Sequence, residues 1–389
     1  MESRGSNLAP RTNVLIVSSF VLPHAGGVEQ FVDTAKKSLR ARGCLVRVLA
    51  CRPRSSPAEA DATLPSWFIP PGGWPLPVGG WRTLWREIGA TDVVIANGAR
   101  NLLPALAAIL ARLRRTPVIF VLHGSGAPFA TSSFLYHRLL GSSFEWLVAR
   151  PALHLSHVVA LSRAGVAGAR SRYGVEATYV PYPLRELPPR KRRVAPVGNR
   201  PLGIVWVGRL YPEKNPLGAV AVVERVREIR EATLEIYGDG VLAHQLELLA
   251  RDRPWAVVRG SRTWAQIQQV QDRADVCLST SLRDATQIGI LEPLSRGIPV
   301  VSTRVGDAPR HYVVSQLRKF CVEPVDVDAA AAAILELADV YDRYRDEFAA
   351  NGRLLEARHR QGGATFAALV AATAAPAAAR TGRAAMVGS

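Results

Sequence analysis

Short apolar runs alternate with helix-like segments through the first half of the chain. Continuous apolar runs of this length are typical of parallel strands buried on both faces, and the intervening segments have the pattern of covering helices. We therefore predict a doubly wound parallel sheet in this half. The predicted strands cover residues 13–20, 45–51, 92–97, 117–124, 157–162 and 177–183, and the clearest helices 28–42 and 101–114.

The same alternation restarts after a proline-containing, basic segment, which we interpret as an interdomain linker. A second sheet of the same kind is therefore predicted, giving an α/β fold of two Rossmann-like domains that face a cleft. Ligands of open parallel sheets bind at the carboxyl ends of the strands, so a site is expected in that cleft. The second set of predicted strands covers residues 202–208, 233–238, 256–260, 276–281, 299–303 and 320–324.

These patterns predict the following organisation. An arm (1–12) precedes an N-terminal Rossmann-like domain (13–183), the linker (184–200) and a C-terminal Rossmann-like domain (201–350), and a closing helix (351–372) is followed by a flexible tail (373–389). The Pro-, Gly- and Trp-rich segment 53–81 is expected to be a long loop.

The net charge of +17 favours anionic partners, although the arginine-rich usage of a GC-rich genome explains it equally well. No nucleic-acid-binding module is recognisable, so no nucleic-acid partner is expected. The four cysteines form no CxxC pair, which indicates a reducing compartment. No run approaches the ~20 apolar residues of a membrane span. We expect a cytoplasmic protein.

Two segments bear on membrane contact. The apolar run 14–22 could mimic a signal-peptide core, but we interpret it as the first buried strand. Residues 129–150 mix aromatic side chains with Arg138 and Arg150, a pattern that fits either a helix resting on an anionic membrane or an ordinary packing helix. Peripheral contact at the inner face of such a membrane is therefore kept as an expectation.

Gly26 and Gly27 stand between the first strand and the first helix. Free N–H groups and the helix dipole attract phosphate at such a position, and glycine lets a pyrophosphate approach the main chain. The alternative is a plain tight turn. A dinucleotide-binding site is disfavoured, because no GxGxxG is present and the second strand ends without an acidic residue.

Two cations follow the first strand of the second domain. Arg209 and Lys214 are five residues apart on a loop, where a guanidinium and an ammonium group suit a diphosphate. In a protein this basic they could equally be two surface charges.

The segment 281–303 carries two acids, Asp284 and Glu292, eight residues apart. A helix is expected to begin between them, leaving the N–H groups of Ile288, Gly289 and Ile290 free for phosphate. One acid would then bind sugar hydroxyls and the other a ribose. The alternative is an ordinary helix acid beside an unrelated loop aspartate.

His123 ends a predicted strand and precedes small residues, which suits either a cleft residue or a satisfied structural histidine. Asp326 and Asp328 have the form of a metal-binding DxD, but Asp326 stands where aspartate caps a helix. No cluster of His, Cys and carboxylate residues suggests zinc. No metal or other cofactor is therefore expected.

Taken in order and spacing, these segments resemble the retaining GT-B glycosyltransferases of the family-4 type, over about residues 13 to 325. The segments are PHAGGVEQF, FVLHG, VALSRAGV, WVGRLYPEKNP, EIYGDG and the Asp284–Glu292 stretch.

The resemblance implies a role for each matching residue. Gly26 and Gly27 would contact the diphosphate or the transferred sugar, and His123 would lie near that sugar and assist the transition state. Arg209 and Lys214 would neutralise the leaving diphosphate.

In the second domain the resemblance places Gly238, Gly240 and Gly260 along the nucleotide, Asp284 on the donor sugar and Glu292 on the ribose. The chain departs from the family pattern at several positions: Asp284 replaces a longer glutamate, Gln287 a glycine, and Asp307 and Arg310 a glycine and a glutamate.

The implied activity is a metal-independent, retaining transfer from a UDP- or GDP-sugar to a hydroxyl. The acceptor would be a lipid-linked or cell-envelope glycan, or a small natural product. Two alternatives stay open: a nucleotide-sugar-binding protein without transfer activity, and a nonhydrolysing nucleotide-sugar epimerase.

Overall fold

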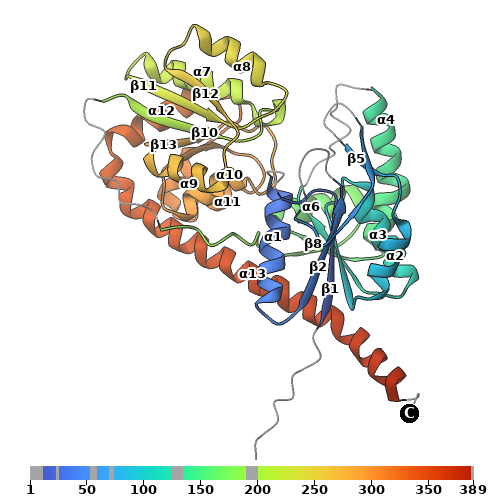
Figure 1. The fold of residues 1–389 in the computed structure, drawn as a ribbon. Helices are drawn as coiled ribbons and strands as arrows, with labels where there is room; N and C mark the ends of the chain where they lie inside the picture. The colour runs from blue at the N-terminus through green and yellow to red at the C-terminus, as the bar shows by residue number, and fades with distance from the viewer. Residues whose placement is uncertain are drawn as a thin grey trace, which may run out of the picture. The chain divides into compact units, whose positions relative to one another are not determined.

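The computed structural model describes residues 12–22, 26–52, 59–69, 74–124, 135–189 and 200–386. The chain divides into two compact units (Figure 1). Unit 1 comprises Met1–Arg185 with Arg360–Ser389, and unit 2 comprises Glu186–His359. The predicted arm over 1–11, the basic block 190–193 and the small residues after Gly124 lie outside the described residues.

Unit 1 is built on a seven-stranded sheet in which every pairing is parallel. Its order is β3-β2-β1-β6-β7-β8-β9. The central strands are buried along nearly their whole length, as their continuous apolar runs predict. The strands are β1 (Asn13–Ser18), β2 (Leu45–Cys51), β3 (Ala62–Leu64), β6 (Val93–Asn97), β7 (Val118–Leu122), β8 (His157–Ala160) and β9 (Ala177–Tyr179).

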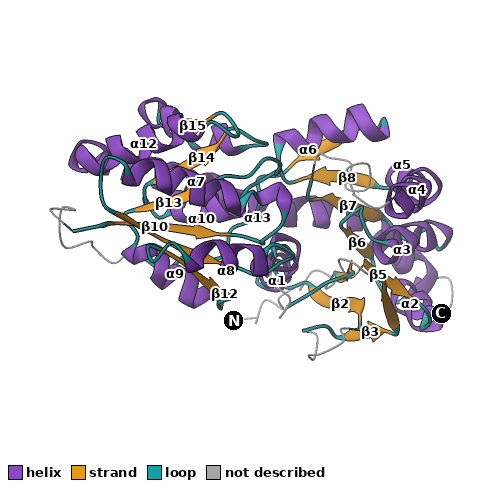
Figure 2. Cartoon of the chain, turned by 90° about the horizontal axis from the view of Figure 1, so that it is seen from above, coloured by secondary structure: helices purple, strands orange, loops and turns teal. Residues whose placement is uncertain are grey.

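Helices cover both faces of this sheet. One layer holds α2 (Trp81–Gly89), α3 (Leu102–Leu113), α4 (Leu135–Phe144), a π-helical turn (Glu145–Ala149) and α5 (Arg150–His154) (Figure 2). Leu84, Leu103 and Leu153 are buried in the core between this layer and the sheet. Elsewhere α1 (Gly27–Arg40) buries Phe31 and Leu39, and α6 (Arg163–Gly168) continues into a second π-helical turn (Ala169–Tyr173).

The segment predicted as a long loop, 53–81, contains strands, so that prediction is wrong in part. β3 pairs with β2, and β4 (Ser66–Ile69) pairs antiparallel with β5 (Trp74–Pro77). Prolines disfavour a central strand because they remove a ladder donor, but they are tolerated at an edge. A two-stranded sheet has only edge strands, which is why β5 can contain two prolines.

Unit 2 contains a six-stranded sheet, also parallel throughout, in the order β12-β11-β10-β13-β14-β15. The strands are β10 (Leu202–Val207), β11 (Ala232–Tyr237), β12 (Ala256–Gly260), β13 (Val276–Ser279), β14 (Val300–Thr303) and β15 (Cys321–Val322). The helices are α7 (Pro216–Arg227), α8 (Ala243–Arg251), α9 (Trp264–Arg273), α10 (Ile288–Ser295), α11 (Ala308–His311) and α12 (Val327–Asp339), with 3-10 turns over Pro212–Lys214 and Ser315–Phe320.

The last helix, α13 (Tyr341–Met386), includes the expected closing helix and continues beyond it. Its first part belongs to unit 2, where the Asn351 side-chain oxygen accepts from the Val313 N–H at 2.7 Å. Its later part belongs to unit 1, where a Cβ on Gly362 would lie 2.2 Å from the Pro181 carbonyl oxygen. Only glycine therefore allows the helix to pack this closely against that backbone.

Candidate active site

Both sheets have a topological switch point, where consecutive connections leave toward opposite faces. In unit 1 it lies between β1 and β6, and in unit 2 between β10 and β13. Ligands in open parallel sheets bind outside the carboxyl ends of the strands at such points. Gly26 follows β1, whereas Lys214 and Asp284 follow β10 and β13. His123 follows β7, the neighbour of β6.

His123 is half-buried, and its ring is held from two sides. Its Nε2 lies 2.6 Å from Oδ1 of Asn97, a fully buried residue at the end of β6. The ring of Phe31 packs edge-on against the imidazole, with 5.2 Å between the centroids. Burial lowers the pKa of His123 to about 3, with the charge of Arg100 acting in the same direction. The imidazole is therefore neutral at physiological pH.

Asn97 in turn is bonded to two elements of unit 1. Its Nδ2 lies 3.1 Å from Ser18 Oγ and 3.4 Å from the Val28 carbonyl oxygen. The Ser18 hydroxyl donates to the Phe20 carbonyl at 2.7 Å. Sequence reasoning missed Asn97; its place at the end of a predicted strand beside the histidine strand was the available signal.

The glycine pair has a local explanation in unit 1. Gly26 has an extended backbone (φ −179°) that any residue can adopt. A Cβ there would lie 2.4 Å from Oε2 of Glu29, a buried residue in the first turn of α1. Tyr182 donates its hydroxyl to the Gly27 carbonyl at 2.8 Å. Glu29, which the sequence reasoning missed, therefore occupies the space that a side chain at Gly26 would need.

In unit 2, Lys214 and Asp284 come together because the strands before them, β10 and β13, are neighbours in the sheet. The Lys214 ammonium forms an ion pair with Asp284 Oδ2, and the two side chains are 18% and 21% exposed. The other carboxylate oxygen accepts from the Ala285 N–H at 2.8 Å. The acid is thus oriented by two donors.

Backbone contacts hold the two loops that carry this pair. The Glu213 carbonyl accepts from the N–H groups of Leu282 and Arg283 at 2.9 and 3.2 Å. The Thr280 hydroxyl donates to the Asn215 carbonyl at 2.6 Å. The Lys214–Asp284 pair therefore rests on a connected framework.

Arg209 lies on the same loop as Lys214 and is more open to solvent. Its side chain is 54% exposed and its guanidinium lies 3.4 Å from Glu213 Oε1. The guanidinium carbon also lies 5.3 Å from the centroid of the Tyr211 ring. These contacts leave much of the guanidinium accessible to an anion.

Only glycine fits at positions 238 and 240, because the backbone of the Arg209 loop passes too close to leave room for a Cβ. A Cβ on Gly238 would lie 1.8 Å from the Gly208 carbonyl oxygen, and one on Gly240 2.5 Å from that of Leu210. Both also have positive φ, at 147° and 156°. They therefore shape the loop that carries Arg209. Gly260 has φ +67° and nothing within 4 Å of its Cβ position.

The N-terminus of α10 differs in one detail from the prediction. The Ile290 N–H donates to the Gln287 carbonyl at 3.0 Å, so the expectation of a free group there is wrong. The reason is that Gln287 is the N-cap of α10, and the carbonyl of an N-cap residue accepts the first bonds of the helix, here also from the Leu291 N–H at 3.0 Å. Within the described chain, Ile288 and Gly289 keep N–H groups without an acceptor.

Glu292 is only 5% exposed and is held by two neutral donors. Trp264 Nε1 lies 3.1 Å from its Oε1, and Gln268 Nε2 lies 3.1 Å from its Oε2. Gln268 is itself bonded to Arg296, which pairs with Asp272. Trp264 and Gln268 escaped the sequence reasoning, because α9 has no marker that relates it to α10.

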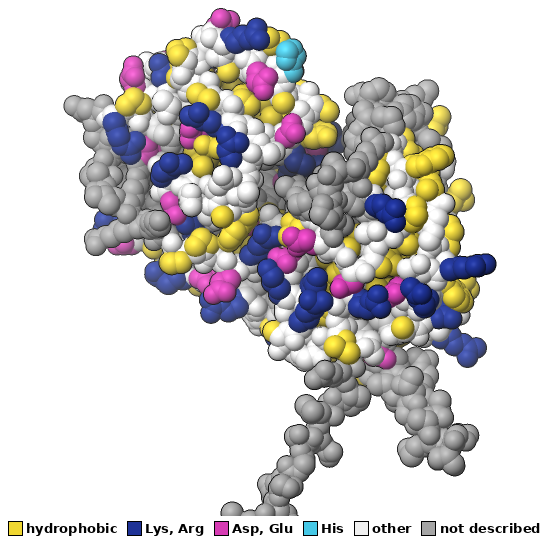
Figure 3. All heavy atoms as spheres, viewed as in Figure 1, with side chains coloured by type: hydrophobic (Ala, Val, Ile, Leu, Met, Phe, Trp, Pro, Cys, Tyr) yellow, Lys and Arg dark blue, Asp and Glu magenta, His cyan; other side chains and the backbone are white. Residues whose placement is uncertain are grey.

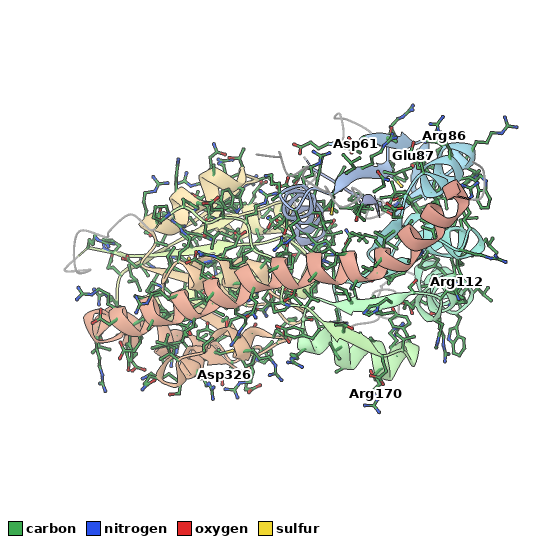
Figure 4. All side chains as sticks on the ribbon, turned by 90° about the horizontal axis from the view of Figure 1, so that it is seen from below. Asp61, Arg86, Glu87, Arg112, Arg170 and Asp326 are labelled. Carbon is green, nitrogen blue, oxygen red and sulfur yellow. The ribbon has the colours of Figure 1, made fainter. Side chains whose placement is uncertain are left out.

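Asp326 caps α12, as predicted, because its side chain accepts from the Ala329 N–H at 2.9 Å. It lies at the outer edge of unit 2 (Figure 4). Within the described ranges, no group of His, Cys, Asp and Glu residues has a metal-binding arrangement. In the same ranges no helix is both long and apolar enough to span a membrane.

Two family models match the chain. Residues 25–183 match the model described as Glycosyltransferase Family 4, and residues 201–339 match the model described as Glycosyl transferases group 1. Each match falls within one of the two sheet-containing units.

Curated relatives are similar over part of their length. A glycogen synthase of Mycobacterium tuberculosis is 28% identical over 195 residues, 49% of this chain and 42% of that protein. A sulfoquinovosyl transferase of Arabidopsis thaliana is 30% identical over 147 residues, 37% of this chain and 28% of that protein. The chain thus spans less than half the length of these relatives.

Solved structures are similar over nearly the whole chain. Anabaena HepE in complex with UDP and glucose has a TM-score of 0.65 at 16% identity, covering 93% of this chain and 100% of that one. Sucrose-phosphate synthase from Thermosynechococcus elongatus has a TM-score of 0.68 at 17% identity, with coverage of 93% and 100%. At these identities the likeness shows the fold.

Proposed function

Since the chain belongs to the family-4, group 1 glycosyltransferases of GT-B fold, we propose that it transfers a sugar from a nucleoside-diphosphate sugar to a hydroxyl acceptor with retention of configuration. The observation that carries the proposal is the Lys214–Asp284 pair at the switch point of unit 2. Support for a uridine donor comes from HepE, which has been solved with UDP and with UDP-glucose.

Each part of the donor has a matching group in unit 2. Lys214, Arg209 and the N–H groups of Ile288 and Gly289 would bind the diphosphate, because cations and helix N-terminal amides suit phosphate. Asp284 would accept hydrogen bonds from hydroxyls of the donor sugar. Glu292 would bind the ribose.

The remaining predicted residues have supporting roles. Gly238 and Gly240 would keep the Arg209 loop beside the nucleotide, and Gly260 would leave room next to it. In unit 1, neutral His123 would contact the transferred sugar. Gly26, Gly27 and the first turn of α1 would face the same substrate.

The reaction breaks the bond between the anomeric carbon and the diphosphate oxygen, with positive charge developing on that carbon. Fixed cations and amides would stabilise the departing diphosphate. The acceptor hydroxyl would attack from the face that the diphosphate leaves, so configuration is retained without a protein nucleophile. Its proton would pass to a leaving phosphate oxygen. Lys214 and Arg209 would supply the positive charge, so the proposal requires no metal.

For the acceptor, we favour a lipid-linked or cell-envelope glycan over a small natural product. Leu139, Trp146 and Leu147 share one helical face of unit 1 and are 62%, 68% and 75% exposed. The Arg150 guanidinium carbon lies 4.6 Å from the centroid of the Trp146 ring. Aromatic and aliphatic side chains beside arginine suit the surface of an anionic membrane.

The positive charge exposed on the same helix layer is consistent with contact with an anionic membrane. Arg86, on α2, and Arg112, on α3, are exposed and come from neighbouring helices (Figure 4). The acids Glu87 and Glu145 are buried and ion-paired. Figure 3 shows hydrophobic and basic side chains together along this edge of unit 1. We therefore propose peripheral contact with the inner face of an anionic membrane.

Incubation with a panel of UDP- and GDP-sugars tests the transfer proposal. Transfer or slow hydrolysis should release nucleoside diphosphate from one donor, and Lys214→Ala should slow the release at least ~10²-fold. Conversion of the donor to its epimer would support the epimerase alternative. Saturable donor binding without release, even with added acceptors, would favour a binding protein.

Cosedimentation with vesicles tests the membrane proposal separately. The protein should bind phosphatidylglycerol-containing vesicles more strongly than pure phosphatidylcholine, and less strongly as salt is raised. The double variant Trp146→Ala/Leu147→Ala should lose most of the binding. Ile229→Ala is the matched control, since Ile229 is 74% exposed in unit 2. Equal loss in the control, or no anionic preference, would contradict the proposal.

A further inference from the structure

We propose that Asn97 is a positioning residue that holds His123 in a single neutral tautomer, with hydrogen on Nε2 and a lone pair on Nδ1 for a hydroxyl of the transferred sugar. The inference rests on the proposed function for the role of that lone pair. The tautomer itself follows from contacts within unit 1.

The orientation of the Asn97 amide is determined by its other neighbours. A backbone carbonyl can only accept, so the amide atom 3.4 Å from the Val28 carbonyl must be the nitrogen. The Ser18 hydroxyl already donates to Phe20 and therefore accepts from the same nitrogen. If the amide were reversed, its oxygen would face the Val28 carbonyl oxygen. Oδ1 must therefore face His123.

An oxygen at that place dictates the proton position on the imidazole. Nε2 lies 2.6 Å from Asn97 Oδ1, so it must carry the hydrogen. The other tautomer would put two lone pairs against each other in a site where Asn97 and Ser18 are both fully buried. Such a mismatch is costly where no water can intervene.

The charged form of the ring does not compete at neutral pH. Burial and the neighbouring Arg100 keep the pKa of His123 near 3, so the imidazole holds a single ring proton. Phe31 restricts the ring plane from the side, with 81° between the two rings. With the hydrogen on Nε2, the in-plane lone pair of the ring lies on Nδ1, which is therefore the acceptor that the imidazole presents.

Nitrogen-15 NMR of histidine-labelled protein tests the tautomer directly. The chain has eight histidines, and the His123 signals are identified by their loss in His123→Gln. The wild type should show an unprotonated Nδ1 and a protonated Nε2 at neutral pH. Asn97→Ala should give a mixture of tautomers. Ser18→Ala is the matched control and should keep the wild-type tautomer, because the Val28 carbonyl still orients the amide.

A double-mutant cycle separates positioning from a merely structural effect. Asn97→Ala should lower kcat/KM for transfer about 10-fold, but should have no further effect in a His123→Ala background.

Either of two results would overturn the proposal: a protonated Nδ1 in the wild type, or an unchanged tautomer in folded Asn97→Ala. Both are read without turnover, so they remain decisive even if the proposed transfer activity is not found. A correct tautomer with no transfer would instead count against the proposed function. Additive losses in the cycle would contradict the positioning role.

Discussion

The Lys214 ammonium and the Asp284 carboxylate form an ion pair between residues 70 positions apart in the chain. The pair joins the loops that follow β10 and β13, the two strands flanking the switch point of unit 2. Lys214 would therefore exchange or share this partner when a diphosphate binds. Asp284, although shorter than the usual glutamate of the family, is held by both the lysine and the Ala285 amide.

Removing either diphosphate cation should slow transfer strongly. We expect Lys214→Ala and Arg209→Ala each to lower kcat/KM at least ~10²-fold, because developing negative charge on the leaving group loses a fixed cation. Steady-state kinetics with the active donor measures the effect. Arg225→Ala is a suitable control, since Arg225 forms a surface ion pair with Asp328 in the same unit. Wild-type rates in both cation variants would remove the assigned roles.

Gln287→Gly should raise the thermal stability of the protein. Gln287 has φ +51°, a region that costs a non-glycine residue about 1 kcal/mol, and its buried Oε1 has no hydrogen-bond partner. Gln287→Ala separates the two causes, because it removes the side-chain amide but keeps the backbone strain. A higher Tm for the glycine variant than for the alanine variant is expected by thermal unfolding. The reverse order would show that strain is not the larger cause.

Trp264→Phe should weaken donor binding more than it slows turnover. The change removes the indole N–H that bonds Glu292 but keeps an aromatic ring. A buried acceptor that loses its donor costs about 1–3 kcal/mol, so the donor KM should rise roughly 10-fold. Trp255→Phe is the control, because the Trp255 ring packs against Arg227. A loss confined to kcat, with unchanged KM, would argue against a ribose role for Glu292.

Acid should destabilise unit 2 through His311. Burial lowers the pKa of His311 to about 4, although the hydrogen bond to the Thr286 carbonyl acts in the opposite direction. The charged groups near the ring are Arg358 and Asp284, and the ring of His359 lies beside it. At a pH between the folded pKa of about 4 and the unfolded pKa of 6.5, His311 binds more protons in the unfolded chain than in the folded protein. The contribution of His311 to the free energy of unfolding is therefore fully present above pH 6.5 and is lost as the pH is lowered toward 4. At pH 5 the loss is about 2 kcal/mol.

Urea unfolding at pH 7 and pH 5 measures this contribution. His311→Gln keeps a donor for the Thr286 carbonyl but cannot titrate, so it should lose less stability on acidification than the wild type. An equal loss in both proteins would place the acid sensitivity elsewhere, for example at His123, whose pKa is also lowered by burial.

Local pattern was sufficient for the sheets and for several site positions. The apolar runs predict β1, β6 and β7 within a few residues, because burial on both faces leaves a continuous signal in the chain. The predicted helix cap at Asp326 is also confirmed. It could be predicted from the sequence because its hydrogen bond joins residues only three positions apart. The β4–β5 pair was not predicted because its prolines argue against a strand unless that strand lies at the edge of a sheet. Whether a strand lies at an edge depends on which strands pair, and the local pattern does not contain that information.

The amino-acid sequence by itself determined where strands end and which reactive side chains stand there, because periodicity and turn residues act over a few positions. Only the tertiary structure decided their partners. Asn97 meets His123, Trp264 and Gln268 meet Glu292, and Glu29 fills the space beside Gly26. The Asn97–His123 contact depends on strand order, and the contacts of Trp264 and Gln268 with Glu292 depend on helix packing. The Glu29 contact, although local in sequence, depends on how the side chain folds back over its own helix start.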